Sequence, residues 1–98
     1  MKNNMRPVHP GEVLREDYLE PINMSANALA LALRVPAPRI NDVVREKRSV
    51  SPDTALRLAK FFGGDAQSCL NMQAAYDLKI AEQSANLAEI IPFSDNVA

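Results

Sequence analysis

Proline, glycine and helix-capping residues divide this chain into short segments, and that division constrains the fold more than any other feature of the sequence. A Ser or Asp cap, or a Pro in the first turn, favours the start of a helix, whereas Gly or a residue before Pro favours its end. These signals place helix starts near His9, Ser25, Pro36, Ser51 and Asp65, and helix ends near Glu20, Arg34, Gly63 and Gln83. No run of β-branched residues alternates as a central strand would, so the sequence predicts an all-α fold of five helices.

Apolar residues recur within these segments at the spacing of helices with one buried face. In the third segment Ile40, Val43 and Val44 stand at i, i+3 and i+4. The corresponding residues are Val13, Leu14, Tyr18 and Leu19 in the first segment, Leu29, Ala30, Ala32 and Leu33 in the second, Leu56, Ala59 and Phe62 in the fourth, and Leu70, Ala74, Leu78 and Ala81 in the fifth. Because aromatic residues make up only 5% of the chain, the expected core is aliphatic.

The size and the cysteine content narrow the class of protein. A chain of 98 residues supports one compact domain over 1–98. Cys69 is the only cysteine, so an intrachain disulfide cannot form, and the sequence lacks the Cys and His cluster of a zinc site. The first ten residues lack the apolar run of a signal peptide, and no stretch approaches ~18 apolar residues. We therefore expect a soluble, cytoplasmic protein without a metal or other cofactor.

Charge is distributed unevenly along the chain, although the net charge is only −1. Residues 34–48 hold five basic and two acidic residues, whereas residues 65–98 hold one basic and five acidic residues. The basic centre suits an anionic partner, and the acidic C-terminal third suits a partner with a different surface.

The second and third segments form the pattern of a helix-turn-helix over about 25–45: two short helices joined by a short turn, the second followed by basic residues. With Ile40 pointing inwards, steps of 100° per residue turn Pro38, Asp42 and Arg45 most directly outwards. Arg39 and Asn41 flank this outer face. A plain helical pair whose arginines form a solvated face is the alternative interpretation of the same spacing.

The outer face and its surroundings supply the candidate DNA-binding residues. Arg can bind guanine through a bidentate fork, Asn can pair with adenine, and Asp can accept from cytosine. The basic loop after the third helix and the first turn of the second helix are placed to contact phosphates. The candidates are Ser25, Asn27, Ala37, Pro38, Arg39, Asn41, Asp42, Arg45, Lys47 and Arg48.

Three strings in order carry a family resemblance: HPGEVLREDYLEP, MSANALALALRVPAPRINDVVREKRSVSPDTALRLAKFFGG and LNMQAAYDLKIAE. Together they resemble the HigA branch of the XRE (Cro/C1-type) helix-turn-helix antitoxins, over about residues 9–82. The resemblance implies a dimeric five-helix protein that represses its own operon by binding operator DNA. It also implies a partner toxin of the RelE-like ribonuclease type, HigB, which the antitoxin neutralises by direct binding.

The sequence departs from that family pattern at three places. Arg34 replaces the Gly common in the turn, so a residue with a Cβ is expected to adopt a positive φ. Pro36 stands where the family usually has a Ser or Thr cap, and Pro38 adds a second ring in the same turn. Cys69 stands where the family often has a large aromatic side chain.

Several residues suggest chemistry that the rest of the sequence does not support. His9, the single histidine, has no neighbouring acid, Cys or Ser partner and is interpreted as a residue at the helix start. Cys69 is interpreted as a small buried hydrophobic residue. Glu12, Glu16 and Glu20 form an i, i+4 ladder on a solvent face rather than a metal site. We therefore assign no catalytic residue and expect that the protein is not an enzyme.

The tail over 83–98 contains an apolar patch from Ile90 to Phe93, interrupted by a Pro that excludes further helix. The tail is disordered, folds back on its own core, or pairs with another chain, and we favour a contact with the toxin or a second subunit. The candidate toxin-binding residues are Glu12, Glu16, Asp77, Glu82, Glu89, Ile90, Ile91 and Phe93. A stand-alone phage-type or metabolic repressor remains the alternative function, and a RelE-like reading frame in the same operon would distinguish the two.

Overall fold

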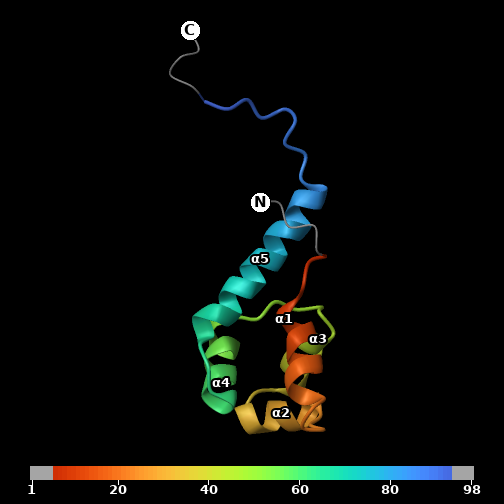
Figure 1. Ribbon diagram of the computed structural model, residues 1–98, viewed down its shortest axis with the longest axis vertical. Helices are drawn as coiled ribbons and strands as arrows, with labels where there is room; N and C mark the ends of the chain where they lie inside the picture. The colour runs from red at the N-terminus through yellow and green to blue at the C-terminus, as the bar shows by residue number, and fades with distance from the viewer. Residues whose placement is uncertain (1–5, 94–98) are drawn as a thin grey trace.

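The computed structural model describes residues 6–93, and this part of the chain is all-α as expected (Figure 1). Its elements are α1 (Pro10–Val13), η1 (Leu14–Leu19), α2 (Ala26–Leu33), α3 (Ala37–Val44), α4 (Pro52–Phe62) and α5 (Ala66–Ser84). Because η1 continues α1 without a break, the described residues form the five expected helices. Residues 1–5 and the last five residues of the expected tail lie outside the described residues.

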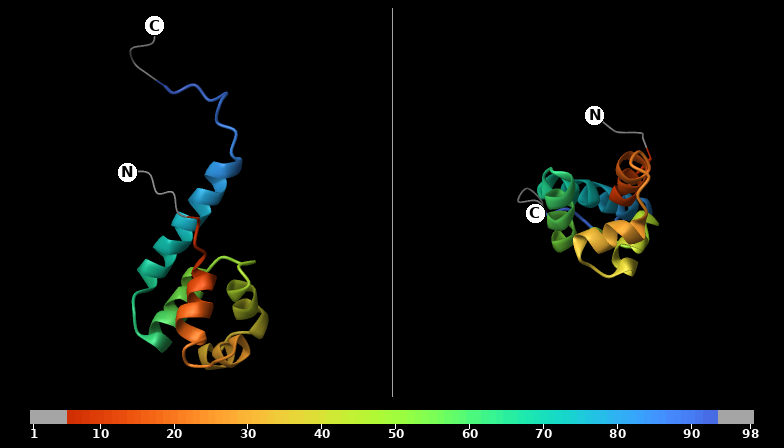
Figure 2. Two further views of the ribbon diagram at one scale, coloured as in Figure 1. Left: turned by 45° about the vertical axis from the view of Figure 1, so that its right-hand side comes forward. Right: turned by 90° about the horizontal axis from the view of Figure 1, so that it is seen from below.

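The core lies between the first helix, α2, α3 and the first turn of α4. Its fully buried side chains include Leu29, Ile40 and Val43, and the residues around them are mainly aliphatic. The start of α5 packs against α4, and the rest of α5 extends away from the other helices and leads into residues 85–93 (Figures 1 and 2). No helix among residues 6–93 has the length and apolar character needed to cross a membrane.

Three capping side chains confirm the predicted helix starts. Ser25, Ser51 and Asp65 each accept a hydrogen bond from the backbone N–H three residues later, over 3.0, 3.2 and 3.1 Å. Such caps satisfy amides that have no partner inside the helix. The helix ends are predicted less well, since α5 continues to Ser84 and the non-helical tail begins two residues later than expected.

Two of the expected apolar faces are wrong in part. In α4, Leu56 is 63% exposed, whereas Phe62 packs against the core as expected, and the buried residues of this helix are Thr54 and Ala55. In α5 the expected residues Ala74, Leu78 and Ala81 are exposed, because this half of the helix extends beyond the helices that would cover it (Figure 1). Its one fully buried residue is Gln73, whose Oε1 accepts from the Val50 N–H at 2.9 Å. Cys69 is half-buried among the apolar residues beside the core, and this burial raises the pKa of its thiol.

The second part of the first helix is a π-helix, which the sequence pattern does not predict. The Glu20 N–H donates to the Arg15 carbonyl five residues earlier, over 3.0 Å. Wider winding brings residues five apart onto one face, so Leu14 and Leu19 are both buried. Tyr18, also expected to point inwards, is 45% exposed and packs its ring against that of Phe62, with the ring centres 5.0 Å apart.

The first helix reaches the core through a close backbone contact with α3. A Cβ added to Gly11 would lie 1.8 Å from the carbonyl oxygen of Val43, so only glycine fits at this position. One turn later, Arg15 donates to the carbonyl of Val44 and pairs with Glu46 at 3.4 Å. The first helix therefore holds the carboxyl end of α3.

His9 begins the first helix from a buried position. Its Nδ1 accepts the Gly11 N–H at 2.8 Å, and its ring lies edge-on to that of Tyr76 in α5, with the centres 4.8 Å apart. Burial lowers the pKa of His9, against smaller opposing effects of Glu46, Asp77 and the Arg48 backbone. The expectation of a residue at the helix start is confirmed, and the imidazole is also a cap and a packing group.

We predict that Gly11→Ala lowers the free energy of unfolding by about 3 kcal/mol, the upper part of the range for overpacking, because the added methyl collides with a backbone carbonyl that cannot move aside. Urea unfolding followed by circular dichroism measures the change. Asp17→Ala, in an exposed position of the same helix, is the control and should leave the midpoint almost unchanged. Equal stability of Gly11→Ala and the wild type would contradict the close contact.

We also predict that the protein loses stability as the pH falls below about 6.5, where the unfolded histidine takes up a proton. The folded His9 has a lower pKa, so between the two pKa values the unfolded state binds more protons, and unfolding becomes easier until the pH reaches the folded pKa.

The matched variant is His9→Asn, whose amide oxygen can keep the cap to Gly11 but does not titrate. Thermal unfolding between pH 7.5 and 5 should show a falling melting temperature for the wild type and a flatter profile for the variant. Parallel profiles for the two proteins would exclude His9 as the source. The carboxyl groups of Glu12, Asp53 and Asp65 titrate at lower pH, because hydrogen bonds to their ionised forms lower their pKa values.

Candidate nucleic-acid interface

The predicted helix-turn-helix at about 25–45 corresponds to α2 and α3, two helices of eight residues each. Ser25 is the N-cap of α2, and Arg45 is the C-cap of α3. Their connection is the three residues Arg34, Val35 and Pro36. In α3 the predicted inner residues Ile40, Val43 and Val44 are all buried. The opposite face of α3 is therefore the one that faces away from the core.

The turn between α2 and α3 has the left-handed backbone that was expected at Arg34, where the family commonly has a glycine. Arg34 adopts the left-handed conformation, with φ 63° and ψ 43°. The Val35 N–H then donates to the Ala30 carbonyl at 3.0 Å, which closes the end of α2. Asn23 and Glu46 also have positive φ, at 55° and 64°, and neither was expected from the sequence.

The amino end of α3 begins without a side-chain cap, as the two prolines implied. Pro36 occupies the cap position and makes no side-chain hydrogen bond, and Pro38 has no N–H to donate. This end of α3 therefore offers fewer backbone donors to an anion than a Ser-capped helix does. The amino end of α2 keeps its cap, but there the Ser25 oxygen already accepts from Ala28.

The candidate residues on and beside the outer face of α3 differ in whether they are already paired. Arg39 donates to Asp53 at 2.6 Å, and Asp42 pairs with Arg48 at 3.5 Å. Asn41 donates to the side-chain oxygen of Asn27 at 2.7 Å and to the Ala37 carbonyl at 3.0 Å.

Two basic candidates remain unpaired. Within residues 6–93, Arg45 and Lys47 are exposed, and their side chains make no hydrogen bond or ion pair. They follow directly on the exposed side of α3, next to exposed Arg48. Their positive charges are therefore available to a ligand without breaking an internal contact.

Two residues at this site were missed from the sequence. They are Asp53 and Arg57: the Oδ2 of Asp53 accepts from Arg39 and, at 2.8 Å, from Arg57. Hydrogen bonds from Arg57 and then Arg39 lower the pKa of the Asp53 carboxyl. The i, i+4 spacing of Asp53 and Arg57 was a usable signal, whereas the contact with Arg39 joins two helices and has none.

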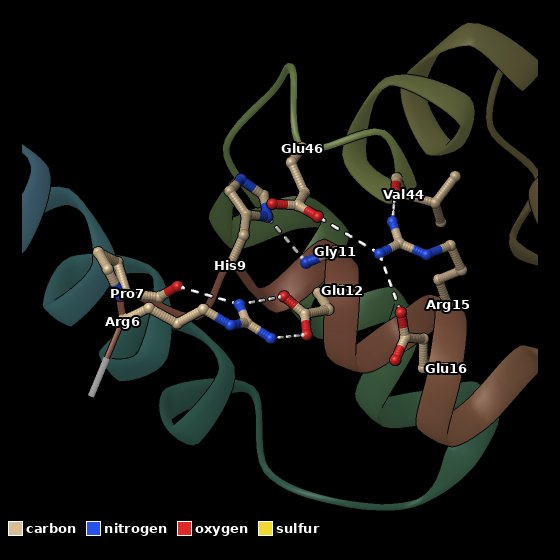
Figure 3. A network of polar contacts seen from close by, with 9 residues as sticks. All are labelled: Arg6, Pro7, His9, Gly11, Glu12, Arg15, Glu16, Val44 and Glu46. Carbon is tan, nitrogen blue, oxygen red and sulfur yellow. Dashed lines mark hydrogen bonds and ion pairs between the residues drawn. The ribbon is translucent and has the colours of Figure 1, made fainter.

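The candidate toxin-binding residues are not gathered into one surface. Glu12 forms a two-bond ion pair with Arg6, over 2.8 and 2.6 Å, and its side chain is only 18% exposed, so the expected solvent ladder is wrong at this residue (Figure 3). Glu16 is exposed and lies 3.3 Å from Arg15. The remaining candidates are exposed along the second half of α5 and the tail: Asp77, Glu82, Glu89, Ile90, Ile91 and Phe93. Among residues 6–93 no cluster of His, Cys and acidic side chains could hold a metal ion.

Two packed helices, a tight left-handed turn and an exposed basic face on the second helix define a helix-turn-helix protein. A helix-turn-helix family model matches residues 16–67 of the chain. Virulence-associated protein I of Dichelobacter nodosus is 61% identical to it over 90 residues, which are 92% of this chain and 83% of that protein.

Two solved structures narrow the family. A HigA-family addiction module antidote protein of Coxiella burnetii has a TM-score of 0.83 and 44% identity, covering 91% of this chain and 100% of the other. The antitoxin HigA of Pseudomonas aeruginosa, solved with the higBA promoter, has a TM-score of 0.79 and 47% identity, covering 81% and 86%. The chain belongs to the HigA-type antitoxins of the XRE helix-turn-helix family.

Proposed function

We propose that this protein is the antitoxin and self-repressor of a type II toxin–antitoxin pair. It binds operator DNA as a dimer and neutralises a RelE-like, HigB-type ribonuclease in the cytoplasm. The observation that carries the DNA-binding half is the basic end of α3, where the exposed side chains of Arg45 and Lys47 have no partner within residues 6–93. The related Pseudomonas aeruginosa antitoxin, solved with the higBA promoter, supports DNA binding as the activity of the fold.

In this proposal α3 lies in the major groove of the operator. Arg45 and Arg39 read guanine, while Asn41, Asp42, Pro38 and Ala37 line the rest of the contact. Lys47, Arg48 and the first turn of α2 at Ser25 and Asn27 contact phosphates, which fix the position of the domain on the duplex. Asn41 already uses its N–H groups on Asn27 and Ala37, so its free oxygen would accept from a base amine.

The proposed binding unit is a homodimer. An eight-residue helix reads only a few base pairs, and a two-fold axis doubles that reading on a palindrome. The half-sites are then about 34–36 Å apart, one helical turn of DNA. The chain has exposed apolar side chains in α5 and the tail, such as Leu78, Leu87 and Ile91, which offer surface for such an association.

We predict that Arg45→Ala weakens binding to the promoter DNA of the chain's own operon by about 1–3 kcal/mol, the value of a bidentate base contact. Lys47→Ala should instead weaken all sequences alike and reduce the salt slope by about one. Fluorescence titration of labelled promoter and scrambled duplexes at several salt concentrations measures both effects.

Lys60→Ala is the matched control, because it removes one exposed positive charge from the last turn of α4 and is not one of the candidate DNA-binding residues. It should change neither affinity nor discrimination. Light scattering of the complex should give two chains per operator. Unchanged promoter affinity of a folded Arg45→Ala variant would mean that a different face binds DNA.

The toxin-binding half of the proposal rests on charge and exposed apolar surface. The C-terminal third is acidic, and Glu82, Glu89 and the apolar residues Ile90, Ile91 and Phe93 are exposed there. An acidic surface complements a basic ribonuclease, and apolar side chains supply the anchor that exposed charges do not. Glu16 and Asp77 would add acidic surface, whereas Glu12 first has to leave Arg6.

We predict that a variant ending at Ser84 protects cells from the co-expressed toxin less well than the full chain, because it dissociates faster without the apolar anchor. Glu82→Gln and Glu89→Gln should mainly slow association. Growth of the co-expressing cells and surface plasmon resonance of purified proteins give the two readouts.

Arg45→Ala is the control here, since it leaves the acidic surface intact and should protect fully. Complete protection by the shortened variant, with an unchanged dissociation rate, would place the toxin contact elsewhere. Loss of protection by Arg45→Ala would mean that the DNA and toxin surfaces overlap.

A further inference from the structure

Asp53 links three helices around the side chain of Arg39. It is the second residue of α4, and its Oδ2 accepts from Arg39 Nη1 of α3 at 2.6 Å and from Arg57 Nε at 2.8 Å. Arg57 in turn donates through Nη1 to the Leu33 carbonyl at the end of α2, over 2.8 Å. The carboxylate is therefore anchored by Arg57 and lies beside the start of the outer face of α3.

This anchoring fixes the orientation of the Arg39 guanidinium. The group is planar and has five N–H donors, so holding Nη1 on one side directs the remaining donors to the other. An arginine that is already ordered loses less side-chain entropy when it binds. The side chain of Arg39 is also 32% exposed, so its remaining donors are accessible to a ligand.

The Asp53 carboxylate also disfavours one kind of contact by Arg39, namely a contact with a DNA phosphate. A negative charge next to an arginine repels the phosphate backbone, which is the source of affinity for any DNA sequence. A base edge in the groove carries no such charge, and it is therefore less affected. One carboxylate can thus strengthen reading of a base and weaken binding to non-operator DNA.

We propose that Asp53 is a positioning residue for sequence discrimination: it orients Arg39 toward a base edge and keeps it from pairing with the nearest phosphate. This inference rests on the operator binding proposed above. Asp53 itself touches no base. It acts only through Arg39, and this distinguishes it from a residue that merely stabilises α4.

The test compares Asp53→Asn with Glu46→Gln. Both substitutions remove one negative charge beside α3, but the native Glu46 pairs with Arg15 and not with Arg39. Dissociation constants are measured for the promoter duplex and for a scrambled duplex of equal composition. For Asp53→Asn we expect tighter binding to the scrambled duplex, and a ratio of the two constants that falls about fivefold or more, the lower limit for losing one base contact. For Glu46→Gln both duplexes should change together, leaving the ratio intact.

A double-mutant cycle separates positioning from stability. In an Arg39→Ala background, Asp53→Asn should no longer change the ratio, because the side chain it orients is gone. If Asp53→Asn does not fold, as judged by its thermal unfolding, Asp53→Ser takes its place in the same cycle. A structural role alone would lower the ratio in both backgrounds, and that result would overturn the proposal.

The outcomes also distinguish this inference from the function on which it depends. A wild-type protein that binds both duplexes equally would refute operator recognition itself. A wild type that discriminates, with an Asp53→Asn variant that discriminates equally well or better, would refute only the role of Asp53. In that case the carboxylate competes with DNA for Arg39 instead of positioning it.

Discussion

The arrangement of this domain depends on the close approach of two backbones, at Gly11 in the first helix and Val43 in α3. Any larger side chain at Gly11 would push the two helices apart, and Arg15 would then lose its hydrogen bond to the Val44 carbonyl. These two contacts fix the carboxyl end of α3, while the left-handed turn at Arg34 fixes where the helix begins. The outer face of α3 is thus oriented before any ligand arrives, which lowers the entropic cost of binding.

The helix starts were predictable because their chemistry is local. Ser25, Ser51 and Asp65 each cap an amide three residues away, so a few neighbouring residues contain all the information. Burial was less predictable, because it depends on what covers a helix. The apolar spacing of α5 continues past the point where α4 and the first helix end, and the same spacing that predicted a helix there did not predict an exposed one.

In the candidate interface, too, some features could be predicted from the sequence and others could not. The periodicity of Ile40, Val43 and Val44 was sufficient to identify the inner face of α3, and with it the outer residues. It could not show that Arg39 and Asn41 are held by Asp53 and Asn27, because those partners come from other helices and are 14 residues away in each case. Sequence reasoning therefore named the candidate residues but could not show which of their side chains are already paired.

At Arg34, in the turn between α2 and α3, backbone strain and electrostatic charge favour different residues. Arg34 has a left-handed backbone, which costs a residue with a Cβ free energy that glycine would not lose. Glycine there would relieve the strain but would also remove an exposed positive charge from the edge of the basic face. No single substitution at position 34 can therefore both remove the backbone strain and keep the positive charge, because the one residue without a Cβ carries no charge.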